Sequence, residues 1–360
     1  MIGLMRSWTG WVPVLAVLLL VAVWGRDLAP VVAVVVAVVL TGAVLSAVHH
    51  AEVVAHRVGE PFGSLLLAVA VTVIEVALIV TLMVSGGPET ASLARDTVFA
   101  AAMITANGIV GLCLLVGAVR FRLAVFNAEG TGAALATVAT LAALCMVVPA
   151  FTTSRPGLEF SPGQLTFAAI ASLLLYAMFV VTQTVRHRDF FLPVAHDGED
   201  PDEHADPPTG RKAAVSLGLL VVALVGVVGL AKVQSPAIEA GVEAAGFPHS
   251  FVGVVIALLV LLPETLAAVR AALRNRIQIS LNLALGSAMA SIGLTIPTIA
   301  VAMIWLDGPL LLGLDSTQIV LLALTVVVST LTVVPGRATR LQGAVHLILL
   351  AAFVFLAINP

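Results

Sequence analysis

The chain consists mainly of long apolar runs that short polar segments separate. Each run approaches the roughly twenty residues that a helix needs to cross a bilayer. We therefore predict eleven membrane-spanning helices. Their approximate ranges are 8–25, 28–49, 63–86, 94–119, 132–150, 163–185, 212–231, 248–270, 278–305, 315–334 and 340–358. The first run lacks a small-residue cleavage site and another apolar run follows at once, so we expect it to stay in the protein.

The basic residues follow this division. With the N-terminus inside, thirteen of the 17 Lys and Arg residues fall in segments on the inner side, where they are favoured. The four outer ones are Arg26, Arg95, Arg155 and Lys232. An error of one span would mix the two sets. The asymmetry thus predicts an N-terminus inside and a C-terminus outside.

The polar stretch between spans six and seven divides the chain into related parts. We predict an extra N-terminal helix over residues 1–27, a first five-helix repeat over 28–186, an acidic cytoplasmic loop over 187–211 and a second five-helix repeat over 212–360. Because five is odd, the two repeats must have opposite orientations. Inverted repeats with a site near the midplane recur in secondary transporters. The predicted fold is an all-α integral membrane protein of this kind.

Two glutamates interrupt the apolar runs at membrane depth. Glu75 and Glu264 each lie in the second span of their repeat, and no other carboxylate lies as deep in the predicted spans. A charge at mid-bilayer costs several kcal/mol, so such residues usually face a partner, water or an ion. Burial favours the protonated form of a carboxyl group, whereas a bound cation requires the ionised form. This competition predicts cation/proton exchange; two hydrogen-bonded structural glutamates are the alternative.

Neighbouring residues offer further oxygen ligands. Pro263 cannot donate a helix hydrogen bond, which frees the carbonyl group of Leu259 beside Glu264. Thr72 lies one turn before Glu75 and adds a hydroxyl group. A plain proline kink is the alternative for Pro263.

The spans that follow the two glutamate spans are rich in small residues. Small residues let helices approach closely, and polar side chains among them can form hydrogen bonds between helices. Tight packing alone would explain the pattern. Beside the glutamates, however, three side chains become candidate ligands or carboxylate partners: Asn107, Ser287 and Ser291.

Two polar clusters lie outside this centre. His50 and His56 belong to a His-rich segment at the inner end of span two, where a solvated surface is the simplest interpretation and a pH sensor the sharper one. The acidic loop does not match the pattern of an EF-hand, and a block of like charges is usually solvated. A regulatory role is the alternative for its residues Glu199, Asp200, Asp202 and Glu203.

Composition excludes several classes of protein. Hydrophobic residues make up 60% of the chain and charged residues 10%, far below the roughly 25% of soluble domains. The scattered basic residues give no support for nucleic-acid binding. The two cysteines form no disulfide framework or zinc spacing, and we expect no cofactor.

Three stretches resemble the calcium/cation antiporter superfamily, and within it the bacterial ChaA-type calcium (sodium, potassium)/proton antiporters. They are residues 59–75, 93–117 and 261–297. The resemblance implies that Glu75 and Glu264 hold cation or protons, and that Asn107, Ser287 and Ser291 line the site. In one respect the chain departs from the family, since a Gly-Asn-Ala run before the glutamate is missing: Val71-Thr72-Val73 and Leu261 stand there.

The resulting prediction is a non-enzymatic antiporter of the bacterial cytoplasmic membrane that exchanges Ca²⁺ for H⁺ by alternating access. The lost Asn ligands leave Na⁺ or K⁺ as alternative substrates. A cation channel and an intramembrane metalloenzyme that uses the His-rich segment are weaker alternatives. The expected partners are the transported ions and the lipid bilayer, and a homo-oligomer is one option.

Overall fold

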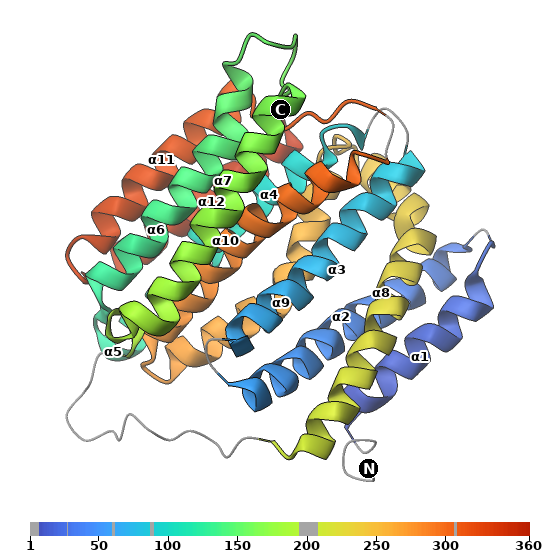
Figure 1. Ribbon diagram of the computed structural model, residues 1–360, viewed down its shortest axis with the longest axis horizontal. Coiled ribbons are helices and arrows are strands. Elements are labelled where there is room, and N and C mark those ends of the chain that lie inside the picture. The colour runs from blue at the N-terminus through green and yellow to red at the C-terminus, as the bar shows by residue number, and fades with distance from the viewer. Residues whose placement is uncertain (1–6, 27, 60–61, 87–89, 194–207, 306–307) are drawn as a thin grey trace.

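The computed structural model describes residues 7–26, 28–59, 62–86, 90–193, 208–305 and 308–360. In these segments the chain forms an all-α bundle of eleven long helices, the number that the sequence predicts (Figure 1). Three of these helices are assembled from consecutive helical segments. The bounds are α1 Trp8–Val23, α2 Pro30–Val58, α3 Phe62–Gly86, α4 Leu93–Met103 continued by the π-helix η3 Ile104–Ile109 and α5 Val110–Phe121, α6 Ala128–Ala142 continued by η4 Ala143–Val147 and η5 Val148–Ala150, α7 Pro162–Val181 continued by η6 Thr182–Arg186, α8 Gly210–Ala244, α9 Phe251–Leu273, α10 Ile277–Ala302, α11 Ser316–Val333 and α12 Arg340–Ile358. A short 3₁₀ turn, η7 Arg188–Phe191, follows η6, and β1 Ala124–Val125 pairs antiparallel with β2 Arg337–Ala338.

The helices have the length and composition of membrane spans. In the described residues, nine helices are long and apolar enough to cross a bilayer. Two shorter apolar helical stretches, Trp8–Val23 and Val69–Val84, complete the set. The chain is therefore a multi-span membrane protein.

Two helices extend beyond the ranges that hydropathy predicts. α2 continues to Val58 rather than ending at residue 49, so the His-rich segment is helical. α8 continues to Ala244 rather than ending at residue 231, and Pro236 lies inside it. Hydropathy detects only the apolar part of a helix, while polar residues such as Lys232 and Gln234 form helix equally well. The predicted ends of these two spans are thus wrong.

Capping residues fix where several helices begin. Ser161 starts α7, Asp315 starts α11 and Thr339 starts α12, each in a capping box with a glutamine three residues later. Such boxes satisfy backbone N–H groups that the first helical turn leaves free. These helices therefore begin close to the residues that the apolar runs predict.

The contacts between helices repeat in a symmetric way. The first helices of the two predicted repeats, α2 and α8, pack together. α3 packs on α10 while α9 packs on α4, and α7 packs on α10 while α12 packs on α5. Each contact between the repeats thus has an equivalent contact in which the two repeats exchange roles. Two inverted five-helix repeats require this symmetry. The exact boundaries of the repeats stay a prediction.

The buried apolar residues form two clusters. One joins α1, α2, α3 and α8 to the face of α9 that carries Val252, Ile256 and Val260. The other fills the space among α4–α7, α10–α12 and the opposite face of α9. In Figure 1, α3, α9 and α10 run between the two groups of helices. The two predicted glutamates therefore lie on the helices that both clusters share.

Candidate cation site

Glu75 projects from α3 and meets the third helix of the other repeat. Its side chain is buried, with 2% of its surface exposed. One carboxylate oxygen, Oε2, accepts a hydrogen bond of 2.9 Å from the Ser291 hydroxyl group of α10. The predicted partnership of a glutamate with Ser291 is present, and it joins the two repeats.

Glu264 projects from α9, which packs against α3. The residue is half-buried, and its Oε2 atom is fully buried. The like charges of Glu75 and Glu52 act on its carboxylate. Burial and repulsion both make a cation a favourable neighbour for this group, since an opposite charge offsets them.

One oxygen atom of each carboxylate and two threonine hydroxyl oxygens, on α3 and α10, are buried without a hydrogen-bond partner among the described residues. They are Thr72 Oγ1, Glu75 Oε1, Glu264 Oε2 and Thr295 Oγ1. Buried polar atoms are nearly always paired, so each such exception calls for a ligand, a water or an ion. Carboxylate and hydroxyl oxygens are the donors that hard cations prefer. The set can hold a cation, or protons on the carboxylates when the cation is absent.

Thr295 is the site residue that sequence reasoning missed. It lies one turn after Ser291 on α10 and is completely buried. Its hydroxyl group lies near the Glu75 carboxylate without forming a hydrogen bond of ordinary geometry. The four-residue spacing of Ser291 and Thr295, which places both hydroxyl groups on one helix face, was the available signal. Ser287 continues this spacing one turn earlier and is half-buried.

Pro263 does not interrupt its helix. α9 is continuous from Phe251 to Leu273, so no segment is unwound beside Glu264. The proline ring still removes the N–H group that would pair with the Leu259 carbonyl group. A ligand role for that carbonyl group stays a prediction.

Asn107 is held in a separate polar network. Its amide nitrogen donates to Thr325 Oγ1 at 2.9 Å, and its Oδ1 accepts from His346 Nδ1 at 3.1 Å. The other ring nitrogen of His346 lies 3.2 Å from the Thr332 hydroxyl group. The π-helix η3 carries Asn107 and packs against α9. The described contacts of Asn107 thus lead to α11 and α12 and not to either glutamate, and its predicted ligand role stays a prediction.

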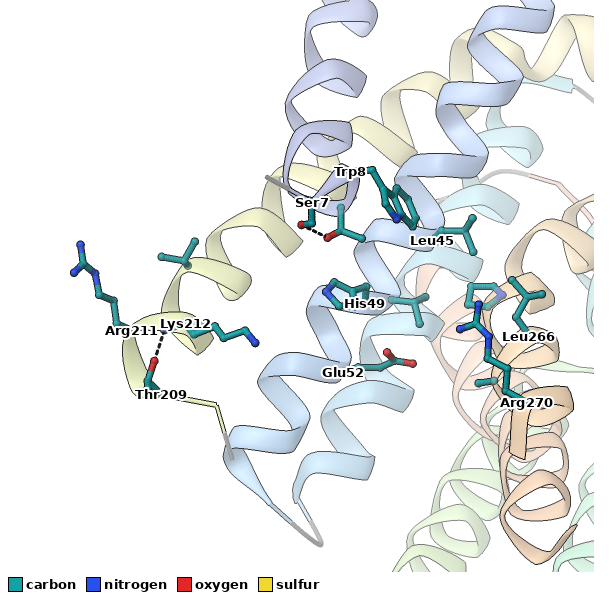
Figure 2. Close-up of a pocket in the computed structure, with 15 residues that line it drawn as sticks. Ser7, Trp8, Leu45, His49, Glu52, Thr209, Arg211, Lys212, Leu266 and Arg270 are labelled. Atoms are coloured by element: carbon teal, nitrogen blue, oxygen red, sulfur yellow. Dashed lines mark hydrogen bonds between the residues drawn. The ribbon is translucent and has the colours of Figure 1, made fainter. Parts of the chain in front are cut away.

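A cavity of about 810 Å³ opens beside Glu264 at the end of the bundle where most basic residues lie. We call this cavity the vestibule. Its walls come from the start of α1, the second half of α2, the start of α8 and the second half of α9 (Figure 2). Pro263 and Arg270 of α9 line it, as do His49 and Glu52 of α2. The vestibule therefore reaches Pro263, the residue directly before Glu264.

The His-rich segment divides into buried and exposed residues. His50 is completely buried and its Nε2 donates to the Thr9 carbonyl group at 3.0 Å, a bond that connects α2 to α1. The expectation of a solvated surface is wrong for His50, because α1 covers it, whereas His56 is exposed. Within the described segments, no group of three His, Cys, Asp or Glu side chains could hold a metal ion. Glu199, Asp200, Asp202 and Glu203 lie outside the described residues.

Asp96 is a further buried carboxylate that the sequence did not single out. It is 5% exposed at the start of α4, where it pairs with Arg95 at 2.8 Å and accepts a 2.7 Å hydrogen bond from Ser92. Arg95 also donates to the Gly313 carbonyl group at 3.1 Å. Ser92, Arg95 and Asp96 thus connect the start of α4 to the segment before α11, at the end of the bundle opposite the vestibule. We call these three residues the Asp96 group.

Comparisons with known proteins show the family to which the chain belongs. A family model described as sodium/calcium exchanger protein matches residues 28–185 and 215–359. The protein y4hA of Sinorhizobium fredii is 47% identical over 325 residues, which cover 89% of this chain and 87% of that protein. The sodium-potassium/proton antiporter ChaA of Escherichia coli is 34% identical over 347 residues, which cover 95% of this chain and 93% of that protein.

A solved structure shows the same fold. The crystal structure of the H⁺/Ca²⁺ exchanger CAX aligns with a TM-score of 0.72 over 98% of this chain and 88% of that chain, at 15% identity. The family model and the similarity to ChaA show a membrane antiporter of the exchanger class. The chain belongs to the sodium/calcium exchanger family, within the calcium/cation antiporter superfamily that its motifs predict.

Proposed function

We propose that the chain exchanges Ca²⁺ for H⁺ across the bacterial cytoplasmic membrane by alternating access. The observation that carries this proposal is the set of four buried, unpaired oxygen atoms of Thr72, Glu75, Glu264 and Thr295. Calcium takes six to eight oxygen ligands in flexible arrangements, and a pair of carboxylates balances its charge. The fold shared with an H⁺/Ca²⁺ exchanger supports the same reading.

Exchange follows from the protonation states of Glu75 and Glu264. A cation binds when both carboxylates are ionised, and it leaves when protons replace it, because the two occupants need the same oxygen atoms. Ser291 holds one oxygen of Glu75 in place. An empty, doubly charged site is the costly state in this apolar setting, so the site changes sides with either cation or protons bound.

Sodium or potassium is the second candidate substrate. The antiporter ChaA, which resembles this chain over nearly its whole length, is named for sodium and potassium. The polar Asn side chains of many superfamily members are absent before Glu75 and Glu264, where Val71-Thr72-Val73 and Leu261 stand. Fewer ligands suit a monovalent ion better than calcium. A channel would use the same carboxylates and differs by conducting without a proton gradient.

Proton flux in everted membrane vesicles tests the proposal. An acid-inside gradient is formed, calcium, sodium and potassium are added separately, and internal pH is followed. We expect calcium to dissipate the gradient. Glu75→Gln and Glu264→Gln should each abolish this response, because a neutral amide binds a cation poorly and cannot exchange a proton.

Glu243→Gln is the matched control, since Glu243 is exposed near the end of α8 and lies outside the site. It should behave as the unaltered protein does. Full activity in Glu75→Gln or Glu264→Gln would refute the proposed site. A response to sodium or potassium alone would keep the mechanism and change the substrate, whereas cation currents without a proton gradient would favour a channel.

A further inference from the structure

The vestibule carries more positive than negative charge. Arg211 and Lys212 of α8 and Arg270 of α9 line it, and Glu52 of α2 is the one carboxylate among its described lining residues. Positive charges raise the electrostatic energy of a cation that approaches them. A cation that reaches Glu264 through this space therefore needs a compensating negative charge.

Glu52 is placed to supply that charge. Figure 2 shows Glu52 on α2 and Arg270 on α9 reaching into the same space from opposite walls. Their charges attract each other, yet they form no salt bridge, since within the described residues only Arg95–Asp96 and Arg155–Glu159 meet within 4.0 Å. Glu52 is also exposed, lines the vestibule, and accepts no hydrogen bond from the described residues. Its oxygens are free for a hydrated cation.

The charge of Glu52 also reaches the central site. Glu264 follows Pro263, which lines the vestibule, and the Glu52 carboxylate acts electrostatically on that of Glu264. Val252, Ile256 and Val260 face the cluster of α1, α2 and α8, and Glu264 continues this four-residue spacing along α9. The two carboxylates are thus close enough to interact, and Glu52 is the one that lines the open vestibule.

We propose that Glu52 is an access site, at which the transported cation binds transiently in the vestibule before it passes to Glu264. The site takes hydrated hard cations, and its charge offsets the field of Arg270. The other titratable or charged groups near Glu52 are His49 on its own helix, Lys212, which reaches inward from α8, and Glu264 on α9, whereas Arg211 points away from Glu52 (Figure 2). This inference rests on the proposed antiport.

The test compares cation uptake from the two faces of the membrane. The full chain is reconstituted in liposomes in one orientation, and calcium is titrated on the vestibule side or on the opposite side. A local charge of this kind changes the rate at which a protein encounters an ion by about tenfold or more. Glu52→Gln should raise the calcium concentration for half-maximal rate about tenfold on the vestibule side. The value on the opposite side should stay unchanged, because Glu52 does not line that path.

Thermodynamics adds an internal check. A substitution cannot change the equilibrium constant of exchange. If Glu52→Gln weakens calcium binding from the vestibule side, another step of the transport cycle must therefore change by a matching factor. Protons that enter through the same vestibule should show a weakening of similar size in Glu52→Gln. Arg270→Gln removes a positive charge, so it should lower the calcium concentration for half-maximal rate on the vestibule side. Glu52→Asp keeps the negative charge, so this concentration should stay within about twofold of that of the unaltered protein.

Each outcome separates this inference from the proposed function. An unaltered protein without exchange would overturn both. Exchange in the unaltered protein, with equal shifts on both faces or none in Glu52→Gln, would overturn the access site alone. Should Glu52→Gln fail to fold, Arg270→Gln decides: an unchanged vestibule-side value would overturn the proposal, and a lowered one would support it.

Discussion

At the scale of single residues, the site is defined by which polar atoms lack a partner. Many hydroxyl groups in this chain bond a carbonyl group of their own helix, as Thr298 does with Leu294 at 2.7 Å. Thr72 and Thr295 have no such bond in the described structure, although both are buried. Leaving a buried polar group unpaired costs about 1–3 kcal/mol. A cation or proton that binds these atoms removes this cost, which stabilises the occupied site.

Removing one of these hydroxyl groups should weaken cation binding. Thr72→Val and Thr295→Val keep the shape of the side chain and delete one oxygen ligand. A loss of about 1 kcal/mol corresponds to an increase of about fivefold in the half-saturating cation concentration. Cation titration of proton flux in vesicles measures this value, with Thr298→Val as the control from the same helix. Unchanged half-saturation in both variants would contradict a ligand role.

The sequence identifies residues of this site better than it identifies their partners. Glu75 and Glu264 stand out because a carboxylate in an apolar run is costly wherever the helix packs. Thr295 and Asn107 look alike in sequence, as polar residues in helices rich in small ones, yet one faces Glu75 and the other bonds Thr325 and His346. Which way a buried polar residue turns depends on helix rotation, and a single chain does not reveal that.

At the scale of helices, close approach depends on small residues at the crossing points. Gly253 of α9 faces the backbone of α4, and a Cβ atom added there would lie 2.8 Å from the carbonyl carbon of Asp96 and the nitrogen of Thr97. Backbone atoms cannot move aside as a flexible side chain can. This crossing joins the second helix of one repeat to the third helix of the other.

Gly253→Ala should therefore destabilise the bundle. Forcing an extra methyl group into a tight crossing typically costs about 1–3 kcal/mol. Thermal unfolding of the purified protein in detergent should show a lower Tm. Gly218→Ala in α8 is the control, since a Cβ atom there meets nothing within 4 Å. A Tm as high in Gly253→Ala as in the control would mean that the crossing is looser than described.

Helix count and order follow from hydropathy, whereas helix ends do not. Eleven apolar runs predict eleven helices because a bilayer leaves the backbone few other ways to satisfy its hydrogen bonds. The polar ends of α2 and α8 lie beyond the hydrophobic signal, and so the prediction stops short of them. The pairing of α3 with α10 and of α9 with α4 arises from tertiary packing, which hydropathy does not encode.

At the scale of the whole molecule, the distribution of basic residues predicts the orientation of the protein in the membrane. The vestibule opens at the end that holds Arg57, Arg270 and most other basic residues. The positive-inside rule places this end in the cytoplasm. In this orientation the vestibule would open to the cytoplasm, and the Asp96 group would lie at the outer end of the bundle, where Asp96 lines a smaller cavity of about 280 Å³.

Cysteine labelling tests this orientation. Arg57→Cys at the basic end should be protected from a membrane-impermeant thiol reagent in intact cells, and Thr153→Cys at the opposite end should react. The native Cys113 and Cys145 are buried and provide a low background. The reverse pattern would invert the topology and assign the vestibule to the outer face.

The bond between α1 and α2 has a consequence for the role of the extra helix. The Thr9 carbonyl group accepts hydrogen bonds from both Ser46, at 2.7 Å, and His50. Without α1, these two polar side chains would face hydrocarbon, and the vestibule would lose the wall that Trp8 and Thr9 provide. The extra helix, which lies before the two segments that match the family, thus separates the vestibule and its polar side chains from lipid.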